Sequence, residues 1–159
     1  MIRNLEEKIE KEPTIQQATT AFHIAIIYKT MRNIADAEKW MKKACEIAEE
    51  TDGKNLEYLM PLIGLGSIEV EKKNFDSALE KYEEGIEIFL DKRQNDDIPL
   101  TIEGTFFEIA KIYWQKNNKE KGIKVVKQLV EITNLEKIAS LNDFIGRLNQ
   151  FYIDIGKPL

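Results

Sequence analysis

The chain has few of the residues that cross-link or punctuate small proteins. Its 159 residues include one cysteine and one histidine, which excludes a disulfide framework and a zinc site built from cysteine and histidine. Eight glycines and four prolines are too few for an all-β sandwich or barrel, which needs a turn every ~8–12 residues. With 28 acidic against 23 basic residues and a net charge of −5, the chain also lacks the basic surface of a nucleic-acid binder.

Long apolar runs are missing as well. No stretch reaches the ~18–20 apolar residues of a membrane span, and residues 1–8 lack the apolar run of a secretory signal. The lone thiol of Cys45 suits a reducing compartment, so we expect a cytoplasmic protein without a membrane partner. The chain contains 43% apolar and 32% charged residues, which suits one compact domain or one short repeat array.

A pattern of asparagines and small residues recurs along the chain. Asn33, Asn74 and Asn118 each follow a polar residue and open a helical pattern, where the asparagine side chain can accept from first-turn amides. One small residue lies eight positions before each asparagine and another lies four positions after it: Ala25 and Ala37, Gly66 and Ala78, Ala110 and Gly122. Such residues let two antiparallel helices approach closely where they cross.

These units resemble the tetratricopeptide repeat, whose pattern is W-x₂-L-G-x₂-Y…A-x₃-F. The second unit matches at Leu62, Leu65-Gly66 and Ala78, with Glu69 in the place of the usual tyrosine. The other two units match in the same register. The asparagines are 41 and 44 residues apart, whereas the family period is about 34 residues, so we expect the additional residues between the units.

The resemblance implies an all-α fold, a right-handed α-solenoid of three antiparallel helix pairs with a C-terminal capping helix. We expect a single domain over residues 1–159, with repeats at about 15–52, 55–92 and 99–133 and the cap at about 134–156. The helix patterns lie at 15–31, 34–51, 56–72, 75–92, 100–116 and 119–133, with a short additional helix at 2–11. Thr14 and Gln17 predict a capping box before the first pair.

The capping helix carries two candidate apolar faces. Its main stripe is expected at spacings of three and four, through Ile138, Leu141, Ile145, Leu148, Tyr152 and Ile155. Phe144 and Phe151 lie off that stripe, seven residues apart and therefore on one face. This second face either forms a homodimer or widens the buried stripe.

In this family the first helices of successive pairs line a concave groove that holds a segment of a partner. The resemblance therefore implies groove residues just off the packing stripes of these helices: Phe22, Ile26, Lys29, Ile63, Ser67, Val70, Phe107, Lys111 and Trp114. A largely apolar and aromatic face of this kind marks a partner site, with Trp114 as a candidate hot spot. The alternative is that some of these side chains pack against neighbouring helices.

One subfamily grips the C-terminal carboxylate of chaperones with Lys, Asn and Arg on these first helices. The matching places here hold Phe22, Ile26, Gly64, Gly104 and Glu108, which cannot supply the required donors. We therefore expect no carboxylate clamp.

No catalytic, metal or cofactor site is indicated. His23 and Cys45 lie on adjacent predicted helices, but no oxyanion hole, glycine-rich loop or third residue accompanies them. The acidic runs lack calcium-ligand spacing. We expect a non-catalytic module that binds a peptide or helix segment of a neutral or basic partner. A small chaperone for a secreted or assembly subunit and a peptide-responsive regulatory fragment are alternatives.

Overall fold

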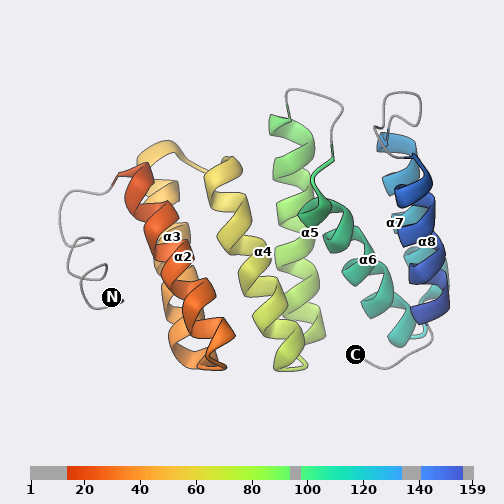
Figure 1. Cartoon of the computed structure of the whole chain (residues 1–159), viewed down its shortest axis with the longest axis horizontal. Helices are drawn as coiled ribbons and strands as arrows, with labels where there is room; N and C mark the ends of the chain where they lie inside the picture. Colours follow the sequence, from red (N-terminus) through yellow and green to blue (C-terminus); the bar gives the residue numbers. More distant parts are fainter. Residues whose placement is uncertain (1–13, 94–97, 134–140, 156–159) are drawn as a thin grey trace. The chain divides into compact units, whose positions relative to one another are not determined.

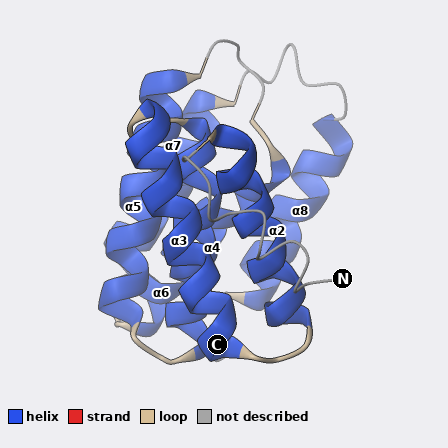
Figure 2. Cartoon of the chain, turned by 90° about the vertical axis from the view of Figure 1, so that its left-hand side faces the viewer, coloured by secondary structure: helices blue, strands red, loops and turns tan. Residues whose placement is uncertain are grey.

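The computed structural model describes residues 14–93, 98–133 and 141–155, and every regular element in these ranges is a helix (Figure 2). In chain order the helices are α2 (Ile15–Thr30), α3 (Ile34–Asp52), α4 (Leu56–Glu71), α5 (Phe75–Lys92), α6 (Leu100–Gln115), α7 (Lys119–Ile132) and α8 (Leu141–Asp154) (Figure 1). The predicted helices agree with α2 to α7 to within one residue at each end. The predicted helix at 2–11, residues 134–140 and residue 156 lie outside the described residues.

Side-chain caps explain where several of these helices begin. Thr14 and Gln17 form the predicted capping box, in which Gln17 Oε1 accepts from the Thr14 amide at 2.8 Å. The side chains of Asn33 and Asn118 each accept from the backbone amide three residues later. These contacts confirm two of the three predicted asparagine caps and fix the starts of α3 and α7.

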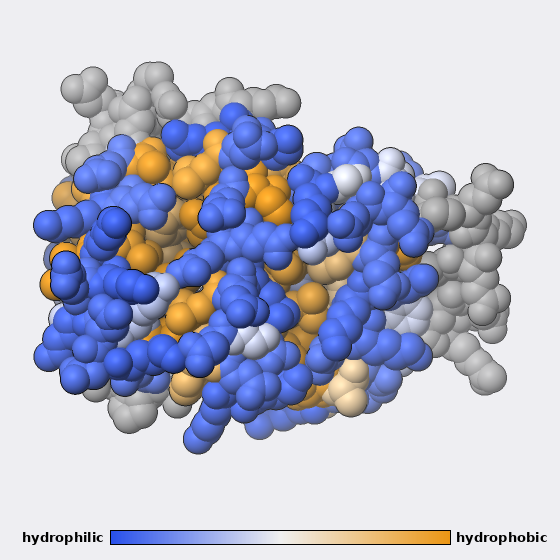
Figure 3. All heavy atoms as spheres, turned by 180° about the vertical axis from the view of Figure 1, so that it is seen from behind, coloured by the Kyte–Doolittle hydropathy of each residue, from blue (hydrophilic) through white to orange (hydrophobic). Residues whose placement is uncertain are grey.

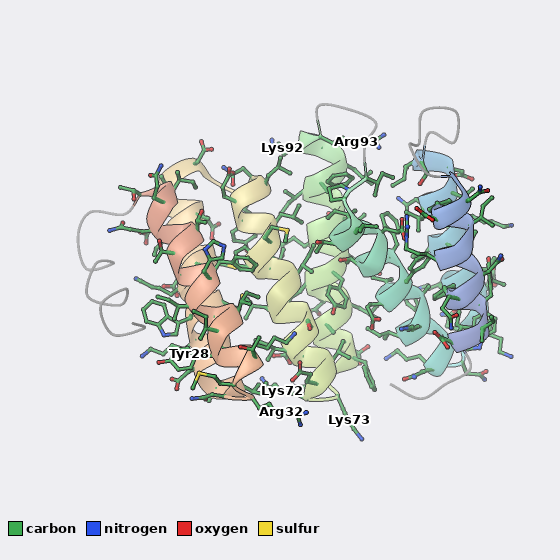
Figure 4. All side chains as sticks on the ribbon, in the orientation of Figure 1. Tyr28, Arg32, Lys72, Lys73, Lys92 and Arg93 are labelled. Atoms are coloured by element: carbon green, nitrogen blue, oxygen red, sulfur yellow. The ribbon has the colours of Figure 1, made fainter. Side chains whose placement is uncertain are left out.

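The turn inside each helix pair contains a residue with left-handed backbone. Arg32, Lys73 and Asn117 have φ angles of 58°, 62° and 58°, and each directly precedes a repeat asparagine. The asparagine amide then donates back to the carbonyl oxygen five residues earlier, at 2.8 to 2.9 Å, a pattern that commonly ends a helix on glycine. Figure 4 labels Arg32 and Lys73 at the turns that end α2 and α4. Because a non-glycine residue pays roughly 1–2 kcal/mol for this conformation, packing of the pairs imposes the turn.

The chain divides into two compact units, Met1–Lys92 and Arg93–Leu159. In the first unit, α2 packs against α3, α4 against α5, and α3 against α4. Gly66 is required where α4 crosses α5, because a Cβ there would lie 2.5 Å from the Tyr82 ring. Ala25, Ala37 and Ala78 are fully buried. The predicted role of small residues at the helix crossings is thus confirmed.

In the second unit, α6 packs against α7. A Cβ at Gly122 would lie 3.1 Å from the carbonyl oxygen of Ala110, so small residues also serve this crossing. The side chains of Phe151 and Ile155 from α8 join the same buried cluster. This arrangement fits the expected cap on the last pair, and the single domain expected over residues 1–159 stays a prediction.

The predicted stripe of the capping helix is wrong in its phase. Ile145 and Tyr152, which were assigned to the buried stripe, are 43% and 51% exposed. Phe144 and Phe151 are 2% and 4% exposed, so they belong to the buried stripe and cannot form the suggested dimer face. Both sets repeat at three and four residues, so periodicity alone could not choose between them.

Candidate partner-binding face

One stripe on each first helix of the first unit stays accessible. On α2 it runs through Thr19, His23, Ile26 and Thr30, which are all exposed. The positions 41 residues later lie on α4 and are half-buried or exposed: Met60, Gly64, Ser67 and Glu71. These eight residues are called the open stripe below. Spacings of four, three and four residues keep each set on one helix face.

Lys29 joins the two halves of the open stripe. Its ammonium Nζ donates to Ser67 Oγ and lies 3.4 Å from Glu71 Oε1, so it crosses from α2 to α4. The Lys29 side chain is 27% exposed and the Glu71 side chain 45%. The halves therefore adjoin at this end, and the charge of Lys29 is balanced within the face.

The open stripe differs from the predicted groove by a rotation around each helix. Of the predicted residues in the first unit, Ile26 and Ser67 lie on the stripe and Lys29 at its edge. Phe22 packs against the core, and Ile63 is 8% exposed and close to the Cβ position of Gly85 on α5. The expectation that Phe22 and Ile63 face the groove is therefore corrected. Val70 is half-buried.

The corresponding stripe of α6 lies in the second unit, through Gly104, Glu108, Lys111 and Gln115. The predicted residue Lys111 is half-buried there and pairs with Glu108 at 3.0 Å. The two predicted aromatic residues lie elsewhere: Phe107 stacks on Phe151 of α8 with ring centroids 4.8 Å apart, and Trp114 packs against the same cluster. Phe107 and Trp114 thus take the packing role that the sequence left open as an alternative.

Several stripe residues were missed because the sequence analysis favoured aromatic side chains. Large aromatic groups beside a packing stripe are drawn into the interior, whereas small and polar groups remain outside. The available signal was the shared spacing at a separation of 41 residues. The missed members are Thr19, His23, Thr30, Met60, Gly64 and Glu71.

A charged brace connects α3 with α4 in the first unit. Glu69, which replaces the usual family tyrosine, is 7% exposed and accepts from Lys72 Nζ at 3.0 Å and from Asn74 Nδ2 at 2.8 Å. Lys72 Nζ also donates to Glu38 Oε2 at 3.0 Å. Burial raises the pKa of Glu69, but the hydrogen bonds from Asn74 and Lys72 outweigh it and hold this pKa below its ordinary value. Hydrogen bonds from Lys42 and Lys72 likewise lower the pKa of Glu38.

A buried ion pair fastens α8 in the second unit. Glu103 on α6 is 5% exposed, and both of its carboxylate oxygens accept from Arg147, from Nε at 2.5 Å and from Nη2 at 2.9 Å. This bidentate geometry is the strong form of an arginine–carboxylate contact. The hydrogen bond with Glu103 raises the pKa of Arg147. Together with the stacking of Phe107 on Phe151, it sets the register of α8 on α6.

The two nucleophile candidates have different environments. Cys45 is 8% exposed, and burial together with Glu84, Glu46 and Glu49 raises the pKa of its thiol to about 12. At neutral pH this thiol stays protonated, which is the inert form. His23 is exposed on the open stripe, with its ring centroid 5.8 Å from that of Phe22.

Two searches of the described residues concern metal ions and membranes. No group of three or more His, Cys, Asp or Glu side chains among them is arranged to hold a metal ion. None of the helices in the described ranges is long and apolar enough to cross a membrane. Hydrophilic residues cover most of the side opposite to that of Figure 1, with hydrophobic residues visible between them (Figure 3).

Comparison with known proteins gives two family matches and a structural likeness. Models described as tetratricopeptide repeat match residues 16–91 and residues 104–134. Among solved structures, the chain is similar to BtubC (BKLC) from P. vanneervenii, with a TM-score of 0.68 and 21% identity. The match covers 76% of this chain and 48% of that chain, so it spans about half of the length of BtubC. At this identity the likeness concerns the fold. No curated protein matches the chain by sequence.

Proposed function

The chain belongs to the tetratricopeptide repeat family, and we propose that it binds a peptide or helix segment of a partner protein on the open stripe. The observation that carries this proposal is the accessible row of side chains on α2 and α4, joined by the contacts of Lys29 with Ser67 and Glu71. The backbone groups inside the helices are hydrogen-bonded within them, so side chains must select the ligand.

The chemistry of the open stripe favours a ligand with apolar anchors. Ile26 is 38% exposed and Met60 is half-buried, so both offer apolar contact area. Three hydroxyl groups and His23 supply polar contacts between them. A net charge of −5 steers neutral or basic segments toward the molecule more readily than acidic ones. In this proposal the protein acts in the cytoplasm as a non-catalytic adaptor or regulator, without nucleic acid or cofactor.

A charge introduced on the open stripe tests the proposal. The full-length wild type and an Ile26→Glu/Met60→Glu variant would be used to capture proteins from the native cell, with Ile123→Glu as a matched control. Ile123 lies on α7 and is 41% exposed, so its substitution alters charge outside the stripe. We expect the stripe variant, but not the control, to lose a partner. The partner's binding segment is then titrated directly.

The outcomes separate the site from the function. If the stripe variant retains the full affinity of the wild type for that segment, the open stripe is not the binding site. Circular dichroism of each variant shows whether the fold is intact, because unfolding would also abolish capture. The identity of the segment distinguishes an adaptor from a chaperone of a secreted or assembly subunit and from a receptor of a regulatory peptide.

A further inference from the structure

Helix α8 is apolar on two opposite sides. Its inner side is the buried stripe of the second unit, whereas Ile145, Tyr152 and Ile153 on its outer side are 43%, 51% and 67% exposed. Asn149 is exposed between them, and Gly146 is exposed with no atom within 4 Å of its Cβ position. These five residues are called the outer face. A helix that is apolar on two sides is typical of one covered on both.

The outer face carries no charge, which restricts what can cover it. Two copies of a chain with net charge −5 repel each other unless their contact avoids the acidic surfaces. The exposed side of α5 shows the contrast, because it carries Glu80, Glu83, Glu87 and Asp91. A basic partner would gain nothing from an uncharged face, whereas a second copy meets no like-charge repulsion there. Charge therefore favours a second copy of this chain.

We propose that the outer faces of two copies pair antiparallel about a two-fold axis at Asn149. Ile145 and Ile153 lie four residues on either side of Asn149, and Gly146 and Tyr152 lie three residues on either side. An antiparallel pair centred there brings Ile145 and Gly146 level with Ile153 and Tyr152 of the second copy. The space beside Gly146 leaves room for one of these large side chains, so the face is complementary to itself, as a two-fold contact requires.

Asn149 gives this pairing its register. On the axis, the side-chain amides of the two copies meet and can donate to and accept from each other. A single polar residue in an otherwise apolar helix contact fixes register at some cost in stability. A shift by one turn would bury each asparagine against an apolar side chain and leave its amide without a partner.

The size of the outer face makes the dimer weak. A contact centred on three partly exposed apolar side chains falls below the ~1,200 Å² of a standard specific interface. Association is therefore expected on the order of 100 μM, as in a transient complex. The pairing does not involve the open stripe, so it stands or fails independently of the proposed function.

Sedimentation equilibrium of the full chain tests the pairing, at concentrations from about 10 μM to about 1 mM. The average mass of the wild type is expected to rise from the monomer value of 18.5 kDa toward twice that value. Ile153→Asp places two charges against apolar groups in the dimer and is expected to raise its dissociation constant at least tenfold. Ile123→Asp, at an exposed isoleucine of α7, is the matched control and should associate like the wild type.

A wild-type mass that stays at 18.5 kDa throughout, or equal association of Ile153→Asp and wild type, would overturn the proposal. The axis is tested separately by Asn149→Cys in a Cys45→Ala background, because Cys45 is the single native cysteine. Under mild oxidation this variant should form a disulfide-linked dimer at least tenfold faster than Ile123→Cys in the same background. Equal rates would rule out an axis at Asn149.

Discussion

Helices α4 and α8 each pack on a preceding helix pair, but they do so with different chemistry. A Cβ at Gly64 of α4 would lie 2.6 Å from Met41 Cε, so α4 approaches α3 closely, and Lys72 braces the edge of this contact. Helix α8 instead inserts Phe151 against Phe107 and adds a buried ion pair. The difference shows that one helical geometry is stabilised either by close approach or by large side chains.

The same comparison explains why α4 continues into a pair and α8 presents an outer face. Buried residues follow the same spacing in both helices: Tyr58, Leu62 and Leu65 in α4, and Phe144, Leu148 and Phe151 in α8. The next residue is Gly66 in α4, where α5 crosses, but Tyr152 in α8. A second helix cannot approach α8 as closely as α5 approaches α4, because the tyrosine ring fills that space.

The largest expected effect removes the aromatic anchor of α8. Phe151→Ala should destabilise the second unit by about 3–5 kcal/mol, because a buried ring leaves a cavity and loses its stack on Phe107. The two tryptophans lie one in each unit, so Trp114 in a Trp40→Phe background reports denaturant unfolding of the second unit. Tyr152→Ala on the outer face is the control and should change stability by less than about 1 kcal/mol. Equal losses would show that α8 is not anchored through Phe151.

Two glycines of first helices should respond in opposite directions. Gly66→Ala brings a methyl group within 2.5 Å of the Tyr82 ring and should cost about 1–3 kcal/mol. Gly104 of α6 has no atom within 4 Å of its Cβ position, so Gly104→Ala should gain about 0.5–1 kcal/mol from helix propensity. Thermal unfolding of both variants gives the sign. A stabilising Gly66→Ala would mean that close approach does not hold α4 and α5 together.

The charged brace predicts an acid sensitivity in the first unit. The folded-state pKa values of Glu38 and Glu69 lie below their ordinary value of 4.5, so their contribution to stability is present above about pH 4.5. It is lost as the pH falls through the lowered folded-state pKa values. Lys72→Met should therefore move the acid-unfolding midpoint to higher pH, as read by Trp40 fluorescence. An unchanged midpoint would show that Lys72 does not couple to these carboxylates.

Local patterns in the sequence determined most of the fold. Asn33 and Asn118 mark helix starts, and Gly66 and Gly122 mark crossings, because each acts through neighbours a few residues away or through one steric requirement. The facing of individual helix sides could not be predicted in this way. In α8 two stripes have the same spacing, and only the contacts of Phe151 and Arg147 with α6 select one of them.

The candidate site was harder to predict than the fold for a related reason. Phe107 and Trp114 have the composition of binding residues, but an aromatic side chain near a seam gains more by packing into it. The open stripe consists of what remains outside, including Thr19 and His23, which no motif singles out. Only Ile26, Ser67 and Lys111 of the predicted residues lie on exposed stripes of first helices.

The smallest expected effect compares the turns of the two units. Lys73 has a φ of 62°, so Lys73→Gly should relieve backbone strain and gain about 1 kcal/mol after the entropy cost of glycine. Asn117, with a φ of 58°, should gain only about half as much, because asparagine tolerates the left-handed region better than lysine. Glu80→Gly, inside α5, should instead lose about 1 kcal/mol. Chemical denaturation measures all three, and equal gains at Lys73 and Asn117 would show that residue type does not limit these turns.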